Sequence, residues 1–104
     1  MNESNANKVR IINSEKIIAF YESIGFELGY ETHKKSKYPV VKDLRNKVVY
    51  RNIDFMSNDH MALLYNSALF ANHLMLDKGY INEEIKKVLD LQMYKYVNCI
   101  ICLN

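Results

Sequence analysis

Two cysteines near the C-terminus have a spacing that can support metal or redox chemistry. Cys99 and Cys102 form a Cys-x-x-Cys pair, in which two thiols can bind zinc or cycle between dithiol and disulfide. A zinc site needs two more ligands, and His60 and His73 would lie about 220° apart around one helix. We therefore treat the cysteines as weak metal candidates and favour their packing as small apolar side chains in an apolar tail.

Motifs for nucleophilic or metal-assisted catalysis are missing from the sequence. It contains no HExxH pattern and no recognisable nucleophile motif, and its three glycines form no phosphate-binding loop. A catalytic histidine–carboxylate pair would meet in space rather than in sequence, so this alternative stays open. We expect no catalytic residue, no cofactor and no resident metal, and hence a protein that binds rather than transforms its partner.

A basic segment at residues 33–51 is the strongest functional signal. It holds seven cations and one acid, net +6, between two flanks of net −2, which together give the whole-chain charge of +2. Such a segment can neutralise phosphates while its tyrosines stack on bases, can dock on an acidic protein surface, or can be a solvated face. The candidate partner- or nucleic-acid-binding residues are Lys34, Lys35, Lys37, Tyr38, Lys42, Arg45, Lys47, Tyr50 and Arg51.

The N-terminal half must supply the elements that position this segment. Residues 1–7 are polar and are expected to form a disordered tail. Ile17, Phe20, Tyr21 and Ile24 have helical spacing before Gly25 and predict the apolar face of a helix. Alternating apolar residues before and after this helix predict strands. The expected elements are a strand at 8–12, a helix at 14–24, a strand at 26–31, a short strand beginning at 40–41 and a strand at 47–56.

Two helices are expected in the C-terminal half. Residues 60–77 are apolar nearly all round the helix, so this helix is either central in the monomer or covered by a second copy in a homodimer. Asn82 should cap the second helix, and the tail at 97–103 should continue it or form a strand. The expected inward face of the second helix comprises Ile85, Val88, Leu89, Gln92 and Tyr96.

These elements predict an α+β fold in the order β-α-β-β-α-α, with a small antiparallel sheet and helices packed on one face. We expect one compact domain at residues 8–104, since 49% of the residues are hydrophobic and 25% are charged. No apolar run approaches the roughly 18 residues of a membrane span, and the polar N-terminus carries no secretory signal. Two free thiols then suggest a reducing compartment, and we expect the cytoplasm.

Residues 9–31, VRIINSEKIIAFYESIGFELGYE, resemble the opening strand, helix and strand of the vicinal oxygen chelate family. The resemblance rests on AFYESIGFE, which is similar to the family's helix end, and it implies a βαβββ module that binds a metal or a small molecule. The strand KVRIIN has no His, Glu or Gln where the family's first metal ligand would lie, so no ligand is assigned.

The leading hypothesis is a small, non-enzymatic intracellular interaction protein. Asn, Lys, Ile and Tyr make up 41 of the 104 residues, a bias toward A/T-rich codons that is typical of phage and plasmid accessory proteins. We expect such a protein to bind and inhibit a host protein, such as a defence nuclease, through its basic face in the host cytoplasm. The alternatives are nucleic-acid binding through residues 33–51 and a chelate-like metal or small-molecule binding protein.

Overall fold

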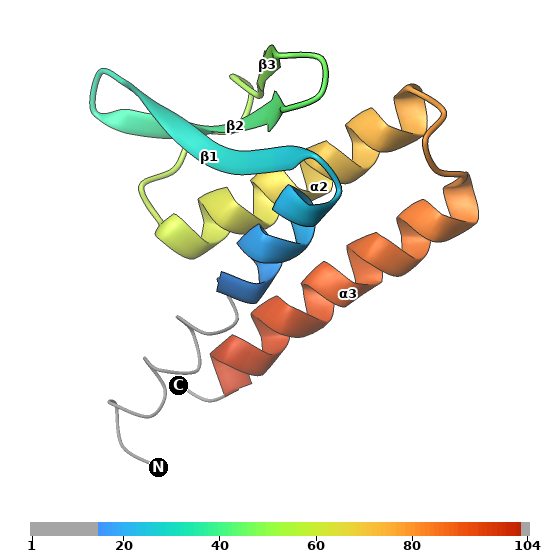
Figure 1. Ribbon diagram of the computed structural model, residues 1–104. Helices are drawn as coiled ribbons and strands as arrows, with labels where there is room; N and C mark the ends of the chain where they lie inside the picture. The colour runs from blue at the N-terminus through green and yellow to red at the C-terminus, as the bar shows by residue number, and fades with distance from the viewer. Residues whose placement is uncertain (1–14, 103–104) are drawn as a thin grey trace.

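The computed structural model describes residues 15–102, and the side chains of residues 15–95. The first described helix, α1, covers residues 15–23, and the expected strand at 8–12 lies outside the described residues. The elements that follow are β1 (Phe26–His33), β2 (Ser36–Asp43), β3 (Val48–Arg51), α2 (His60–Asp77) and α3 (Glu83–Cys102) (Figure 1).

The described elements form three layers. The strands make an antiparallel sheet in the order β1-β2-β3, and α2 packs on one face of it against β1 and β2. Helix α3 packs on α2 on the side away from the sheet, and α1 lies beside both helices (Figure 1). The predicted α+β fold is therefore confirmed, with a small antiparallel sheet and helices on one face.

Helix α1 ends as the sequence predicts. Gly25 has a φ of +97°, and a Cβ at this position would come within 3.0 Å of Arg45 Nε, so both conformation and space favour glycine. Ile17 and Tyr21 are buried and Ile24 is half-buried, which confirms most of the predicted apolar face. Phe20, the fourth residue of that face, remains 38% exposed.

Helix α2 is the central element of the core. Its N-cap is Asp59, whose carboxylate accepts hydrogen bonds from the backbone N–H groups of Met61 and Ala62. The sheet covers one side of the helix and α3 another, so burial within one chain accounts for its apolar circumference. A homodimer through residues 60–77 stays a prediction. The buried core comprises Ile17, Tyr21, Phe26, Leu28, Val41, Leu64, Ala68, Ala71, Leu74, Met75 and Met93.

Strands β2 and β3 differ from their predicted lengths. Strand β2 begins at Ser36 and runs through Pro39, although proline in a central strand is unfavourable. Strand β3 pairs only as far back as Val40. Beyond this pair, the N–H of Asn52 donates to the carbonyl oxygen of Pro39 at 3.0 Å, and Pro39 has no N–H to return, so the ladder ends there. The predicted strand at 47–56 ends at Arg51, and Ile53 beyond it is 63% exposed.

The predicted inward face of α3 is correct at Leu89 and wrong at Ile85, Val88 and Gln92. Ile85 and Val88 are 45% and 65% exposed, whereas Met93 is buried and Leu89 is half-buried. The helix is rotated so that Asp90 meets a buried polar group of α2, which moves the expected apolar stripe outward. The side chain of Tyr96 lies outside the described part, and the tail continues α3 as a helix to Cys102.

That polar group is Asn72, at the centre of a hydrogen-bonded chain that joins all three helices. Tyr21 of α1 donates its hydroxyl to Asn72 Oδ1 at 2.5 Å, and Asn72 Nδ2 donates to Asp90 Oδ1 of α3 at 2.9 Å. Lys86 closes the chain through a 2.7 Å ion pair with Asp90. Burial raises the pKa of Tyr21 far above its usual value, so the hydroxyl stays a neutral donor.

Replacing Asn72 should therefore loosen the packing of the helices. In Asn72→Leu, the buried Tyr21 hydroxyl loses its acceptor and Asp90 loses a donor, and we expect the free energy of unfolding to fall by about 2 kcal/mol. Urea denaturation would measure the loss. His73→Leu, at the exposed neighbouring position, is the control and should change stability little. Equal stability of the two variants would contradict the role given to Asn72.

Candidate functional site

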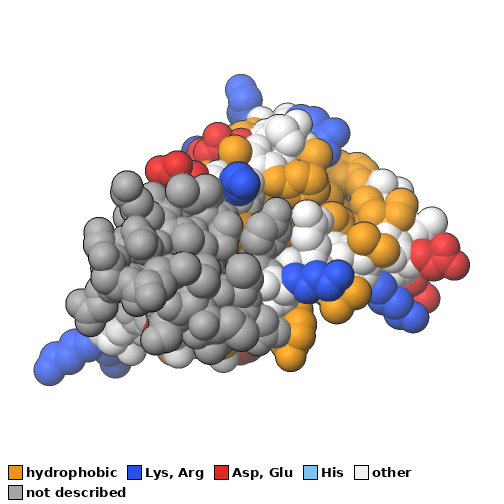
Figure 2. Space-filling model, turned by 90° about the horizontal axis from the view of Figure 1, so that it is seen from below, with side chains coloured by type: hydrophobic (Ala, Val, Ile, Leu, Met, Phe, Trp, Pro, Cys, Tyr) orange, Lys and Arg blue, Asp and Glu red, His pale blue; other side chains and the backbone are white. Residues whose placement is uncertain are grey.

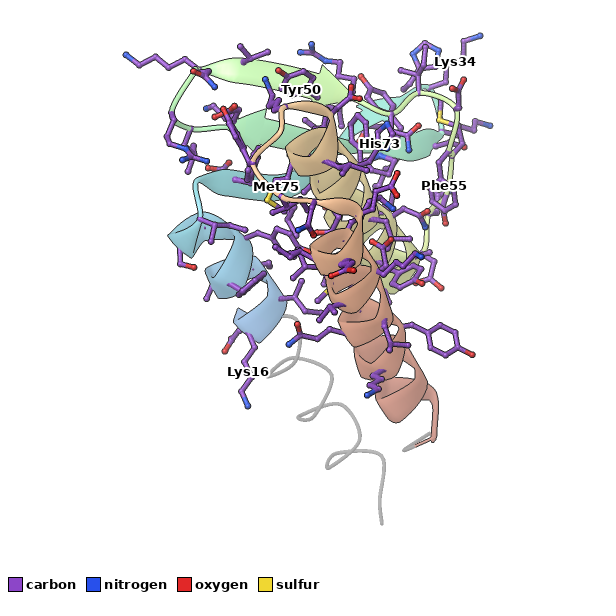
Figure 3. All side chains as sticks on the ribbon, turned by 90° about the vertical axis from the view of Figure 1, so that its right-hand side faces the viewer. Lys16, Lys34, Tyr50, Phe55, His73 and Met75 are labelled. Carbon is purple, nitrogen blue, oxygen red and sulfur yellow. The ribbon has the colours of Figure 1, made fainter. Side chains whose placement is uncertain are left out.

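The fold divides the basic segment between the two ends of the sheet. Lys34 and Lys35 form the turn between β1 and β2, and Lys34 projects at the edge of the sheet layer (Figure 3). Arg45 and Lys47 lie in the turn between β2 and β3. The eight residues of β2 hold the two turns about 25 Å apart. The segment that looks continuous in sequence is therefore two separate groups of cations in space.

Both turns place a lysine in the left-handed region of backbone conformation. Lys34 has a φ of 58° and Lys47 a φ of 57°, and they are the only non-glycine residues with positive φ in the described part of the chain. A residue with a Cβ is disfavoured there by about 1 kcal/mol, and glycine or asparagine is the usual choice. At each end of the sheet, a lysine thus occupies a turn position where glycine would leave the backbone less strained than lysine does.

A buried carboxylate builds the turn that presents Lys47. Asp43 is fully buried, and its Oδ1 accepts hydrogen bonds from the backbone N–H groups of Arg45 and Asn46 at 3.0 and 3.1 Å. Its Oδ2 accepts a 2.8 Å bond from Asn46 Nδ2. Burial alone would raise the pKa of Asp43, but these hydrogen bonds and the positive charge of Lys78 together hold the pKa below its usual value.

Because the folded protein holds this carboxylate ionised, acid should weaken the fold. As the pH falls through the ordinary aspartate pKa of 3.8, the unfolded chain takes up a proton before folded Asp43 does, so the stabilisation present above that pH is lost below it. Chemical denaturation across the acidic range should show the free energy of unfolding falling less steeply for Asp43→Asn than for the wild type. If the free energy of unfolding had the same pH dependence in both proteins, Asp43 would not be the group responsible.

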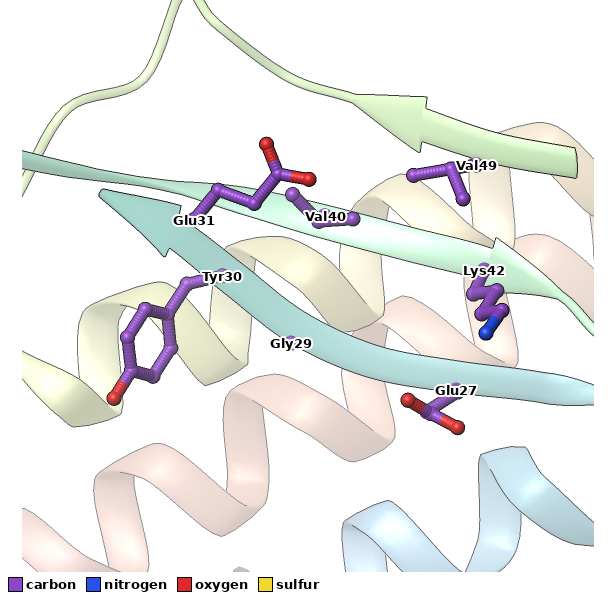
Figure 4. Close-up of a pocket in the computed structure, with 7 residues that line it drawn as sticks. All are labelled: Glu27, Gly29, Tyr30, Glu31, Val40, Lys42 and Val49. Carbon is purple, nitrogen blue, oxygen red and sulfur yellow. The ribbon is translucent and has the colours of Figure 1, made fainter. Parts of the chain in front are cut away.

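The face of the sheet opposite α2 carries a hollow. Gly29 lies on β1 between Glu27 and Glu31 on this outer face, and a Cβ at Gly29 would meet nothing within 4 Å. The resulting cavity has a volume of about 260 Å³ and an apolar floor formed by Val40 and Val49 (Figure 4). No described helix covers this face (Figure 1).

A polar cluster closes one end of the outer face. Arg51 Nε lies 3.1 Å from Glu31 Oε2, and the Tyr38 hydroxyl donates to the same oxygen at 2.6 Å. The hydrogen bond from Arg51, with the one from Tyr38, holds the pKa of Glu31 below its usual value, and the bond to Glu31 raises the pKa of Tyr38. Arg51 and Tyr38 are therefore already engaged within the chain.

The other candidate residues of the basic segment separate between the two faces. Lys42 lies on the outer face opposite Glu27, whereas Lys37 lies on the helix side with its Nζ 5.1 Å from the centre of the Tyr30 ring. Tyr50 is half-buried on the helix side, beneath the amine of Lys78. Tyr38 and Tyr50 thus lie on opposite faces and form no common stacking platform.

Four cations of the segment have no hydrogen bond or ion pair from their side chains within the described residues. They are Lys34, Lys35, Lys42 and Lys47. Arg45, by contrast, packs its guanidinium 5.0 Å from the centre of the Tyr80 ring and donates to the carbonyl oxygen of Ile24. The available positive charge lies at the two turns and on the outer face.

Metal candidates gain no support from the described residues. Among them, no group of three or more His, Cys, Asp or Glu side chains is placed to hold an ion. His60 packs edge-on against Tyr30, and His73 is exposed. Cys99 and Cys102 lie in the last turns of α3, and their side chains fall outside the described part, so the cysteine hypothesis stays a prediction.

Comparison of the chain with protein-family models, curated proteins and solved structures found no match in any of the three. The order α1, β1, β2, β3 agrees with the strand order that the vicinal oxygen chelate resemblance implies, but α2 then begins at His60. No helix of the described part is both long and apolar enough to cross a membrane.

Sequence reasoning missed two residues that shape this site. Asp43 is the single acid of the basic segment, and its signal was that an aspartate often accepts a hydrogen bond from the backbone N–H two residues on, as it does here from Arg45. Gly29 lies within the strand predicted at residues 26–31. Its signal was the small residue itself, since glycine within a strand often marks a place where a ligand or another backbone approaches closely.

Proposed function

We propose that this protein is a non-enzymatic interaction protein that binds an acidic surface of a protein partner. The binding surface comprises the outer face of the sheet and the two lysine-bearing turns. By covering the acidic surface of its partner in the cytoplasm, the protein would inhibit that partner, as an accessory protein of a phage or plasmid inhibits a host enzyme.

The observation that carries the proposal is the position of Lys34 and Lys47. Each occupies a strained turn position at opposite ends of a sheet face that no described helix covers. A strained backbone position persists where the side chain has a role that glycine cannot fill. At these two positions, the feature that lysine has and glycine lacks is an exposed, unpaired ammonium group. Attraction to an acidic surface is the simplest use of that charge.

The charges between the turns favour a protein over nucleic acid. The outer face between the two turns has no excess positive charge, because Glu27 lies opposite Lys42 and Glu31 pairs with Arg51, so a phosphate backbone that runs from one turn to the other would gain little there. A protein surface can match this pattern with acids opposite the lysines of the turns and polar groups between them. The separation of Tyr38 and Tyr50 onto opposite faces removes the stacking platform that single-stranded nucleic acid would use.

Charge reversal at the turns should abolish partner binding. We expect Lys34→Glu/Lys47→Glu to lose the partner that wild-type protein recovers stoichiometrically from its native cells, and to bind that partner at least about tenfold more weakly in titration, because two attractions become repulsions. The matched control is Lys16→Glu/Lys87→Glu, which reverses two exposed lysines of α1 and α3 and should bind normally.

An equal loss of partner binding in both double variants would contradict the binding surface assigned here. A mobility shift of short single-stranded or duplex DNA or RNA, with affinity falling steeply as salt rises, would favour the nucleic-acid alternative instead. We expect no shift even at low salt.

Lys34→Gly should separate stability from binding. Glycine removes the strain at positive φ, so we expect the free energy of unfolding to rise by about 0.5–1 kcal/mol in thermal or urea unfolding, while affinity for the partner falls. Lys35→Ala removes the neighbouring charge without relieving this strain and should weaken binding with little gain in stability. Unchanged affinity of Lys34→Gly would show that its charge has no role in binding.

A further inference from the structure

Strand β3 forms one edge of the sheet, and its backbone is open on the side away from β2. The N–H of Asn52, one residue past the strand, donates to the carbonyl oxygen of Pro39 in β2 at 3.0 Å. Because alternate residues of an antiparallel strand face its neighbour, Tyr50 also faces β2, whereas Val49 and Arg51 direct their backbone N–H and C=O groups away from it. Within the described part of the chain, no strand, turn or side chain bonds to these outward groups.

None of the elements from β1 to α3 covers this free edge. Among them β3 contacts only β2, and it lies at the rim of the sheet, away from α1 (Figure 1). The other edge of the sheet, on β1, is half covered. The N–H of Leu44 donates to the carbonyl oxygen of Gly25 at 2.9 Å, which fixes the alternation along β1. Phe26 and Leu28 consequently face that edge, and both are buried, so β3 is the more accessible edge.

Strand β3 lacks the features that usually prevent an edge strand from pairing with another chain, which are a proline, a bulge or a lysine within the strand. Its register with β2 is continuous, and its first three residues, Val48, Val49 and Tyr50, are β-branched or aromatic. Its one charged residue, Arg51, reaches across β2 to Glu31 of β1, with Nε 3.1 Å from the carboxylate. The guanidinium is therefore held away from the free edge.

Cations at the beginning of β3 favour an acidic segment beside this edge. Lys47 lies in the turn that leads into β3, and its side chain has no hydrogen bond or ion pair within the described residues. On the helix side, the amine of Lys78 lies 5.1 Å from the centre of the Tyr50 ring. The one acid paired with β3, Asp43 opposite Val48, is fully buried. The helix side of the molecule, seen from below, differs in showing hydrophobic side chains among both acidic and basic ones (Figure 2).

We propose that an extended, acidic segment of the protein partner adds to β3 as a fourth strand of the sheet. Its backbone bonds to the outward N–H and C=O groups of Val49 and Arg51, and its carboxylates lie near Lys47 and Lys78. The main-chain bonds supply affinity, and the two cations supply the preference for an acidic sequence. This inference rests on the proposed function, because it specifies which part of an acidic protein partner meets the sheet.

Amide hydrogen exchange of the full chain, followed by NMR, tests the strand addition. In the free protein, we expect the N–H groups of Val49 and Arg51 to exchange fast and that of Tyr50, bonded to β2, to exchange slowly. The probes are heptapeptides selected on the protein from a random library, and then the protein partner. We expect the selected peptides to be rich in Asp and Glu. Each probe should slow exchange at Val49 and Arg51 by about tenfold or more and leave Tyr50 unchanged.

A proline at position 49 separates recognition of the main chain from recognition of the side chain. Val49→Pro removes an outward N–H and no bond inside the sheet, so it should stay folded by circular dichroism. We expect it to bind the selected peptides at least about tenfold more weakly than the wild type. Val49→Thr is the matched control, because it keeps the N–H and the β-branched shape, and it should bind normally. Equal binding by the two variants would overturn the strand addition.

Further outcomes distinguish this inference from the proposed function. If charge reversal at Lys34 and Lys47 abolishes partner binding but the Val49 and Arg51 amides stay unprotected in the complex, the strand addition is wrong and the proposed function stands. Selected peptides without an excess of acids overturn the strand addition as well. So does protection in the free protein that rises with concentration, because a second copy then occupies the edge. Acidic peptides that protect the edge, without any protein partner, support the strand addition and contradict the proposed function.

Discussion

The hydrogen-bonded chain from Tyr21 through Asn72 to Asp90 sets how the three helices fit together. A buried side-chain amide without hydrogen bonds would destabilise the core. Helices α1 and α3 therefore each supply a hydrogen-bond partner to Asn72. Asp90 can reach it only if α3 turns Leu89 and Met93 inward with it, which leaves Ile85 and Val88 outside. One buried side chain thus decides which apolar residues enter the core and which remain exposed.

The molecule consequently presents two surfaces of different character, the outer face of the sheet and a groove between α1 and α3 that Arg45 of the β2–β3 turn also lines. The outer sheet face combines unpaired lysines at both turns with carboxylates and a small hollow between them. The groove is mostly apolar, with Phe20, Ile85 and Leu89 among its lining residues. A mixed, charged face suits specific docking on another protein, which is the contact proposed for the sheet.

Local structure was predictable wherever neighbouring residues decide it. The end of α1 at Gly25, the helix through residues 60–77 and the alternation of β1 all follow from contacts within a few positions. Strand β2 was underestimated because Pro39 is unfavourable in a paired strand. Its place just beyond the β3 ladder depends on where another strand ends, which the residues around Pro39 do not specify.

By itself, the sequence determined the α+β class, most helix and strand positions, and the concentration of positive charge at residues 33–51. Only the tertiary structure decided that this charge splits between two turns and two faces, because charge adds along the chain whereas a binding surface depends on positions in space. It also decided which side of α3 is buried. The partners in that decision, Tyr21, Asn72 and Asp90, are 51 and 18 residues apart, and periodicity within one helix carries no information about such distant contacts.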